Sequence, residues 1–385
     1  MKTTHKITTA IMALSLAAIS CSERYPGETA IRSRYKNARQ LNDTAAFLAG
    51  MDVRAGSRLL PLTRQDEYRK YREQINQLWN EYKKLDLDNI ASWRRNRVPS
   101  AASATLMYPF SGPDILNALA FFPGAERYIM IGLEPPGNVP DPLSLQGPAL
   151  TAQLWKVKTA LRTILQLNLF RTIEMMSDLK PDYFSSITGI MMFFLARSGY
   201  EILDIHQVYI DRKGEVKSGT PLPAESEAGG VEFTFRKKIG APLQTARFFS
   251  VDLSDGSLSM RRGFAGFLNG HRDFITFIKS ASYLLSYDNF QILRNYLLAN
   301  SRYVVQEDSG IPYKYFPETD WTFSFYGTYR VIAQFANRFQ RDLDPVMKKR
   351  SAGPLPFSFG YGFVPEKSNI MIAKRIVKKK AQPVQ

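Results

Sequence analysis

The spacing of apolar positions predicts a mixed β-sheet covered by helices. From Thr63 onward, large apolar residues recur every three or four positions, which is the period of a surface helix. They are Tyr68, Tyr71, Ile75, Leu78, Trp79, Tyr82 and Leu85. Thr63, with Asp66 three residues later, is the candidate N-cap of this helix. An apolar stripe of this kind usually packs against a core, so we assign it no ligand.

Residues 104–134 carry the clearest local pattern, namely two apolar runs on either side of a short helical segment. The pattern predicts a buried strand at 104–109, a helix at 115–122 and a second strand at 128–133. Strand, helix and strand at this spacing predict a right-handed βαβ unit with parallel strands.

The rest of the chain continues the alternation of helices and strands. We expect further helices at 30–48, 149–177, 181–197, 266–285, 288–300 and 329–342, and further strands at 200–210, 231–237, 245–253, 303–306, 322–326, 356–363 and 369–374. The strands at 231–237 and 245–253 resemble an antiparallel pair. This order predicts an α/β or α+β fold with a mixed sheet covered by helices.

We predict one globular domain at 63–373, preceded by a tether with a weak helix at 21–62 and followed by a basic tail at 374–385. If the domain is divided, the Gly- and Pro-containing stretch at 218–230 is the best position for the boundary.

The first twenty residues have the pattern of an export signal. Lys2 and Lys6 precede an uncharged apolar segment at 7–19, which is too short to span a membrane as a helix. It ends in Ala18-Ile19-Ser20-Cys21, which resembles the lipobox of bacterial lipoproteins. The resemblance implies cleavage before Cys21 and acylation of its thiol. It covers residues 1–21 alone, and the family prefers Leu where this chain has Ala18.

The cysteine content supports this interpretation over ordinary secretion with cleavage after Ser20. Cys21 is the only cysteine in the chain, so it has no internal disulfide partner, and it occupies the position of a lipid acceptor. The expected location is the bacterial cell envelope, at the outer membrane or the periplasmic face, with the domain held to a membrane by lipid.

The charge of the chain bears on its partners. The formal net charge is +16, and 44% hydrophobic residues support a substantial core. In an intracellular protein this charge would suggest nucleic acid, but the export signal argues against that partner. Anionic lipid or wall polymer is the natural counterpart, contacted through Lys374, Arg375, Lys378, Lys379 and Lys380. The alternative is a solvated basic surface without a specific partner.

The sequence offers few side chains that are typical of catalytic or metal sites. After Cys21 the only histidines are His206 and His271, which excludes a multi-histidine zinc site. His206 lies in an apolar strand and is expected in the core. His271 stands beside Arg272 and Asp273, near the start of a predicted helix, where it is either a general base or part of a cap. No nucleophile-elbow or phosphate-loop motif accompanies them.

The βαβ unit has a likeness to the first half of a Rossmann-like domain. In dinucleotide and S-adenosylmethionine folds, an acidic residue that ends the second strand accepts hydrogen bonds from ribose hydroxyls, and Glu134 has that position here. The turn before the helix has Gly112 but lacks the glycine-rich fingerprint, and Pro113 removes an amide donor. We therefore expect a structural βαβ unit and no cofactor or metal.

Four carboxylates remain as candidates for chemistry. Asp114 is interpreted either as the cap of the helix at 115–122 or as a group on the same rim as Glu134, where the pair would do acid–base work or hold a cation. Glu307 and Asp308 end another strand beside aromatic residues, which suits a cation or sugar hydroxyls, although a simple turn also explains them. The aromatic residues are Tyr313, Tyr315, Phe316 and Trp321.

Two functions follow from these patterns. The favoured one is a membrane-anchored envelope lipoprotein whose domain binds or scaffolds an unidentified ligand without catalysis. The alternative is a carboxylate-based hydrolase that acts on an envelope glycan or other polymer, through Asp114 and Glu134 or through Glu307 and Asp308.

Lipidation is directly testable. Cells that express the chain in the presence of labelled palmitate should incorporate label into the protein, because the Cys21 thiol is the expected acceptor. The Cys21→Ala variant should carry no label. Equal labelling of both proteins, or a mature N-terminus at another residue, would contradict the assignment.

Overall fold

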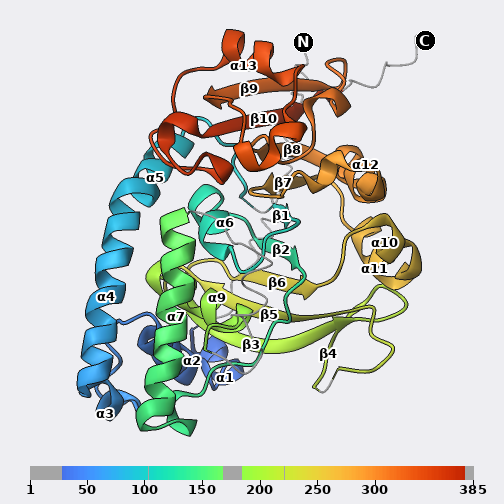
Figure 1. The fold of residues 1–385 in the computed structure, drawn as a ribbon. Helices are drawn as coiled ribbons and strands as arrows, with labels where there is room; N and C mark the ends of the chain where they lie inside the picture. The colour runs from blue at the N-terminus through green and yellow to red at the C-terminus, as the bar shows by residue number, and fades with distance from the viewer. Residues whose placement is uncertain (1–27, 103, 168–183, 221, 378–385) are drawn as a thin grey trace, which may run out of the picture.

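A computed structural model describes residues 28–102, 104–167, 184–220 and 222–377 (Figure 1). Within these residues, ten strands form one mixed sheet in the order β4-β3-β5-β6-β2-β1-β7-β8-β10-β9. The strands are β1 (Thr105–Tyr108), β2 (Arg127–Gly132), β3 (Glu201–Ile210), β4 (Val216–Ser218), β5 (Ala228–Arg236), β6 (Gln244–Ser250), β7 (Phe274–Ile278), β8 (Ser301–Gln306), β9 (Trp321–Gly327) and β10 (Asn369–Arg375). The predicted α/β fold with a mixed sheet is thus confirmed.

The βαβ unit is present as expected. β1 and β2 pair in parallel, with Leu106 opposite Tyr128, and α6 (Ile115–Phe121) connects them. The Asp114 side chain accepts a hydrogen bond from the backbone amide of Asn117, so Asp114 caps this helix.

The five central strands all run in parallel, in the order β6-β2-β1-β7-β8. β1 comes first along the chain; β2 and β6 follow on one side of it, and β7 and β8 on the other. The progression of strands therefore reverses between β1 and β7. In open α/β sheets such a switch point leaves a crevice at the carboxyl ends of the strands.

Antiparallel strands extend the sheet at both edges. β5 pairs antiparallel with β6 and with β3, which confirms the predicted pairing of the segments near 231 and 245. At the other edge, β10 lies between β8 and β9 and is antiparallel to both. The strands on both sides of the loop at 218–230 belong to the same sheet.

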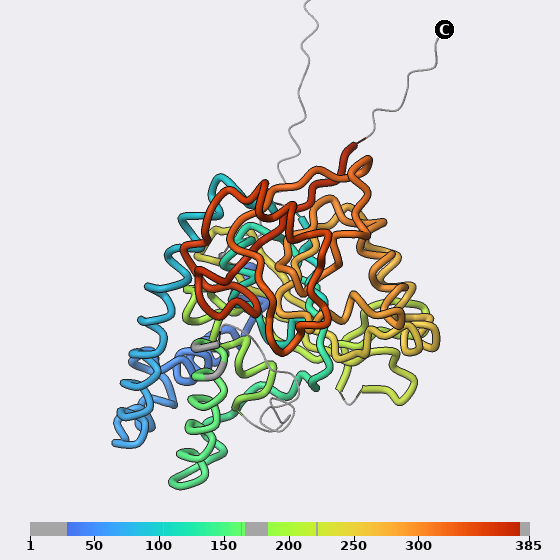
Figure 2. Tube along the Cα trace, turned by 45° about the horizontal axis from the view of Figure 1, so that its top comes forward, coloured from blue at the N-terminus to red at the C-terminus, as the bar shows by residue number. Residues whose placement is uncertain are grey.

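Helices cover both faces of the sheet (Figures 1 and 2). Side chains alternate along β1: Leu106 and Tyr108 enter one core, whereas Met107 enters the other. The first core is shared with α2 (Ala38–Leu48), α4 (Asp66–Tyr82), α5 (Asp88–Arg94), α6, α7 (Gly147–Leu167) and α9 (Ile187–Arg197). The second is shared with α10 (Asp255–Met260), α11 (Arg262–Asn269), α12 (Gln291–Asn300) and α13 (Leu343–Arg350). Short helices α1 (Glu28–Arg34) and α3 (Leu60–Thr63) and a π-helical turn (Lys83–Leu87) complete the N-terminal part.

Several predicted elements were wrong. The apolar segment expected as a helix at 266–285 contains the end of α11 and the buried strand β7. Every residue of β7 is buried, so the run lacks the alternation that would distinguish it from a buried helix. Residues 356–363 form no strand, and the helix expected at 329–342 is replaced by a 3-10 segment (Ala333–Arg338) followed by α13. Thr63 ends α3, and Gln65 is the residue before α4.

The predicted start of the basic tail was also wrong. Lys374 and Arg375 belong to β10, where they pair with Tyr303, Thr322 and Trp321. Cys21, Lys378, Lys379 and Lys380 lie outside the described residues. Of the helices described, none has both the length and the apolar character needed to cross a membrane.

The end of β10 can be tested by truncation. The Arg375 Nε donates to the Ser301 carbonyl at 2.9 Å, and its guanidinium lies 4.4 Å from the Trp321 ring centre. A chain that ends at Ala373 should therefore have a free energy of unfolding about 2 kcal/mol lower than a chain that ends at Val377. Denaturant titration measures the difference. Equal stability of the two chains would mean that β10 does not depend on its last two residues.

Candidate functional site

A cavity of about 300 Å³ opens at the carboxyl ends of the parallel strands, beside the switch point. Four loops line it, and they follow β1, β2, β6 and β7. Their lining residues are Phe110, Gly112, Leu133, Glu134, Val251, Asp252, Leu253, Ser280, Ala281, Ser282 and Leu284, together with Ile131, Gly132 and Phe290. Most of the lining is apolar, with a small number of polar groups, as is typical of small-molecule sites.

Glu134 supplies the most unusual group of this cavity. Its side chain is only 1% exposed, and one of its carboxylate oxygens accepts the Leu133 amide at 3.1 Å. Burial raises the pKa of Glu134 above its ordinary value. Among the described residues no lysine or arginine pairs with it. A buried carboxylate without a cation is costly, so this group is suited to receive donors from a bound molecule.

The backbone at the end of β2 makes room for this carboxylate. A Cβ atom on Gly132 would lie 2.7 Å from the Glu134 carboxylate and 3.0 Å from the Phe248 ring. Glycine is therefore required at 132 for the Glu134 side chain to fold back against the strand.

Asp252 is a second carboxylate at the cavity, and it follows β6. Its oxygens accept the Ser254 amide at 2.9 Å and the Ser254 hydroxyl at 2.8 Å. Because a carboxylate has about four acceptor positions, Asp252 retains capacity toward the cavity. It is exposed, and it was not recognised in the sequence, where it reads as part of an ordinary turn.

The loop after β7 has an unusual backbone. Ser280, Ser282 and Tyr283 have φ values of 55°, 50° and 55°, in the left-handed region that non-glycine residues rarely adopt. The Ser280 hydroxyl is buried and has no hydrogen-bond partner in the described structure. Strained backbone next to an unsatisfied donor is a feature of functional sites.

The residues after β8 hold this loop in its conformation. The Glu307 carboxylate accepts the Ser280 amide at 2.9 Å, and the Ser309 hydroxyl accepts the Ala281 amide at 2.8 Å. The Tyr283 hydroxyl donates to the Asp308 carboxylate, whose other oxygen accepts from Asn369 at 2.6 Å. Glu307 and Asp308 are therefore buried supports of the loop.

Burial has a large effect on these two acids. It raises the pKa of Glu307 to about 8, with a further contribution from repulsion by Asp308. The pKa of Asp308 is also raised by burial. Gly360 packs directly against Glu307, since a Cβ there would lie 2.4 Å from the Glu307 Cγ, and its φ of 62° also favours glycine.

Asp114 supports the same loop from the other side. Besides capping α6, its carboxylate accepts from the Tyr108 hydroxyl at 2.8 Å and from the Lys279 ammonium at 3.3 Å. Both side chains of the Asp114–Lys279 pair are 1% exposed, and Lys279 directly precedes Ser280. Asp114 does not line the cavity, so the rim shared by Asp114 and Glu134 is not formed.

Two of the four aromatic residues near Glu307 belong to the core, whereas Tyr313 and Tyr315 are half-buried. Phe316 and Trp321 are buried and pack edge to face with ring centres 5.4 Å apart. They offer no exposed platform for a sugar beside Glu307 and Asp308.

Neither histidine lines the cavity at the switch point. His271 follows α11 rather than starting a helix, and its Nδ1 lies 2.8 Å from the Phe267 carbonyl. Burial lowers its pKa. His206 is in β3 as expected, but it is half-buried and not in the core, with its Nδ1 3.0 Å from Asp204.

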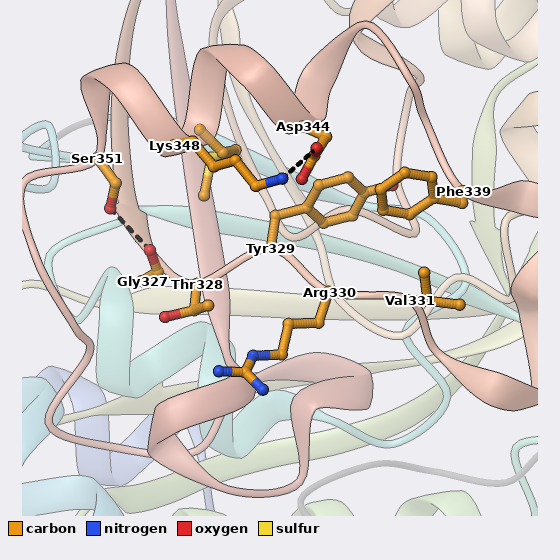
Figure 3. Close-up of a pocket in the computed structure, with 10 residues that line it drawn as sticks. Gly327, Thr328, Tyr329, Arg330, Val331, Phe339, Asp344, Lys348 and Ser351 are labelled. Atoms are coloured by element: carbon orange, nitrogen blue, oxygen red, sulfur yellow. Dashed lines mark hydrogen bonds and ion pairs between the residues drawn. The ribbon is translucent and has the colours of Figure 1, made fainter.

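A wider hollow lies between the end of β9 and α13 (Figure 3). Its volume is about 600 Å³, but Lys348 already binds Asp344 at 2.7 Å, Tyr329 stacks on Phe339 with ring centres 4.9 Å apart, and none of its charged lining residues is buried. It is therefore a weaker candidate than the cavity at the switch point. The described residues contain no group of three or more potential metal ligands.

No protein-family model, curated protein or solved structure matches this chain.

The raised pKa of Glu307 predicts how stability depends on pH. The folded state binds a proton on Glu307 up to about pH 8, whereas the unfolded state releases it near its ordinary pKa of about 4.5. The group therefore stabilises the fold fully in acid, and this contribution is lost as the pH rises through 8.

Between pH 5 and pH 9, the free energy of unfolding of the parent chain should fall by roughly 2 to 4 kcal/mol more than that of Glu307→Gln. The exposed Glu366→Gln variant is the control and should follow the parent chain. Denaturant titrations at several pH values measure these slopes. A Glu307→Gln slope equal to that of the parent would show that Glu307 does not carry a proton in the folded state.

Proposed function

We propose that the folded domain binds a nucleoside-bearing small molecule in the cavity beside β1, β2, β6 and β7. The observation that carries this proposal is Glu134, a buried carboxylate that lines the cavity at the end of β2 and has no cationic partner among the described residues. In Rossmann-like folds an acidic side chain in this position accepts hydrogen bonds from ribose hydroxyls.

The strand order supports this interpretation. Numbered along the chain, the five parallel strands have the order 3-2-1-4-5, which is that of the doubly wound nucleotide-binding sheets. Beyond the fifth strand the sheet continues through β10, which lies antiparallel between β8 and β9. The likeness suggested by the βαβ unit thus extends to the whole central sheet.

The charge of the cavity favours a ligand without phosphate. Its lining contains two carboxylates, Glu134 and Asp252, and no lysine or arginine. Pro113 lacks an amide donor, and the loop after β1 has no glycine-rich cradle for a pyrophosphate. An uncharged nucleoside or a cationic one of the S-adenosylmethionine class is the better fit, because an anion would be repelled.

The volume is consistent with a ligand of this size. About 300 Å³ is at the lower end of the range for small-molecule sites, so a single nucleoside fits better than a dinucleotide. Apolar side chains such as Leu133, Leu253 and Phe290 would contact the faces of a base.

The hydrolase alternative has weaker support. Its candidate acids Asp114, Glu307 and Asp308 are buried and hydrogen-bonded to the fold, and none of them lines the cavity. Glu134 and Asp252 remain available and share the cavity with Phe110 and Phe290, but a cavity of about 300 Å³ is small for a polymer chain. The favoured function is accordingly that of a binding domain.

Attachment to the bacterial cell envelope through Cys21 stays a separate proposal, supported by the export signal and the single cysteine. The nucleoside site and the lipid anchor do not depend on each other.

Calorimetry can test the binding proposal on the full chain. Adenosine, S-adenosylmethionine and S-adenosylhomocysteine are the probes, with ATP and NAD as phosphate-bearing comparisons. We expect at least one of the first three to bind more tightly than ATP and NAD. Glu134→Gln should weaken that binding about tenfold or more, because a charge-assisted hydrogen bond is lost.

Glu126→Gln is the matched control, since this exposed carboxylate precedes β2 at its opposite end. Binding of the effective probe should also weaken as acid protonates Glu134. Tighter binding of ATP than of any phosphate-free nucleoside, or equal effects of the Glu134 and Glu126 variants, would refute the proposal.

A further inference from the structure

A basic groove lies at the N-terminal end of the described chain, remote from the cavity at the switch point. It has a volume of about 860 Å³ and is formed by α1, α2, the start of β3 and the end of β5. Its charged lining residues are Arg32, Lys36, Arg39, Arg54, Glu201 and Arg236. The lining of the groove thus contains five cationic side chains and one carboxylate.

The internal ion pairs of this groove neutralise two of its cations. Arg236 is 1% exposed and its Nε lies 2.6 Å from the Glu201 carboxylate. Arg54 binds both oxygens of Asp43, at 2.8 and 2.7 Å. These pairs are part of the fold and give the groove a fixed wall.

Lys36 and Arg39 are different, because they are exposed and no carboxylate of the described chain pairs with them. Arg32 is exposed at the same groove, one helical turn earlier in the chain than Lys36. Positive charge concentrated in a concave surface attracts anions more strongly than the same charge on a convex one. The groove is therefore complementary to a phosphate group.

We propose that this groove seats the anionic headgroup of a membrane phospholipid and so orients the domain on the bilayer. α1 begins at Glu28, and only residues 22–27 separate it from Cys21. Six residues span at most about 20 Å even when fully extended. In this respect the inference rests on the proposed lipid anchor, which would keep the groove within reach of the membrane surface; the charge of the groove does not depend on it.

The position of the groove separates it from the basic residues near the C-terminus. β3 is the second strand of the sheet and β10 is the ninth, so they are about 34 Å apart at the usual strand spacing. Figure 1 shows α1 and α2 at the β3 end of the molecule and β10 at the other end. The groove is consequently a basic surface separate from Lys374 and Arg375.

Vesicle co-sedimentation tests the proposal with the full chain carrying Cys21→Ser, so that no lipid is attached. Binding is compared between vesicles of phosphatidylcholine alone and vesicles in which about a third of the lipid is phosphatidylglycerol, at low salt. Any contribution of the apolar N-terminal segment is common to both vesicle types. The difference between them therefore reports the electrostatic contact.

The decisive protein is a double variant that reverses two charges of the groove, Lys36→Glu and Arg39→Glu. The matched control is a double variant in the turn between β3 and β4, Arg212→Glu and Lys213→Glu. The groove variant should lose about tenfold or more of its binding to the anionic vesicles, whereas the control should keep most of it. Since all four side chains are exposed, the melting temperatures should stay close to that of the parent. The neutral variant Lys36→Gln with Arg39→Gln should show a smaller loss in the same direction.

Three results would overturn the proposal. The first is binding of the groove variant to anionic vesicles as strong as that of the parent. The second is an equal loss of binding in both charge reversals, which would indicate attraction by net charge alone. Displacement of the protein from vesicles by low concentrations of free glycerol phosphate would instead indicate a site for a small soluble anion. Nucleoside binding is measured without vesicles, so failure here is distinguishable from failure of the function proposed above.

Discussion

The hydrogen bond from the Ser280 amide to the buried Glu307 carboxylate is the contact on which the candidate site depends. It joins the carboxyl end of β8 to that of β7 and holds a loop in which three non-glycine residues are left-handed. Such a conformation costs free energy and persists only where surrounding contacts fix it. Those contacts come from two sides of the loop. Asp308 and Ser309 hold it from one side, and the Asp114–Lys279 ion pair holds it from the other. The acids that a sequence would suggest for catalysis thus serve to shape a loop.

The strand order of the central sheet places this loop at the edge of the cavity. Because the progression of strands reverses between β1 and β7, the loops that follow these strands diverge and leave space between them. The space is lined mainly by apolar side chains and by Glu134, whose charge no cation of the described part of the chain balances. A low-polarity cavity strengthens any hydrogen bond that a ligand donates to this carboxylate. Because the cavity lining offers no cation, a phosphate group would bind poorly there. The lining therefore excludes phosphate-bearing ligands that the fold alone would allow.

Local patterns in the sequence were sufficient to predict β1, α6 and β2, because each of these elements has its own apolar run, cap or turn signal. They were not sufficient for β7, a five-residue run that is buried on both faces and therefore has no period. Asp114 was recognised as a cap, but its partner Lys279 lies 165 residues away in the chain, beyond the reach of any local pattern. Glu307 and Asp308 resemble a surface turn, and they are buried because β10 and Gly360 pack over them. Glu134 was noticed for its place at a strand end, whereas the unpaired state of its carboxylate required the structure.

We propose that Glu134 receives the hydroxyl groups of a ribose in the cavity at the switch point. A crystal structure of the chain soaked with the nucleoside that binds it, or with S-adenosylmethionine, tests this most directly. We expect ligand density between the ends of β2 and β6, with ribose oxygens within about 3 Å of the Glu134 carboxylate. Density for the ligand at another position, or a ligand in the cavity whose ribose makes no contact with Glu134, would contradict it.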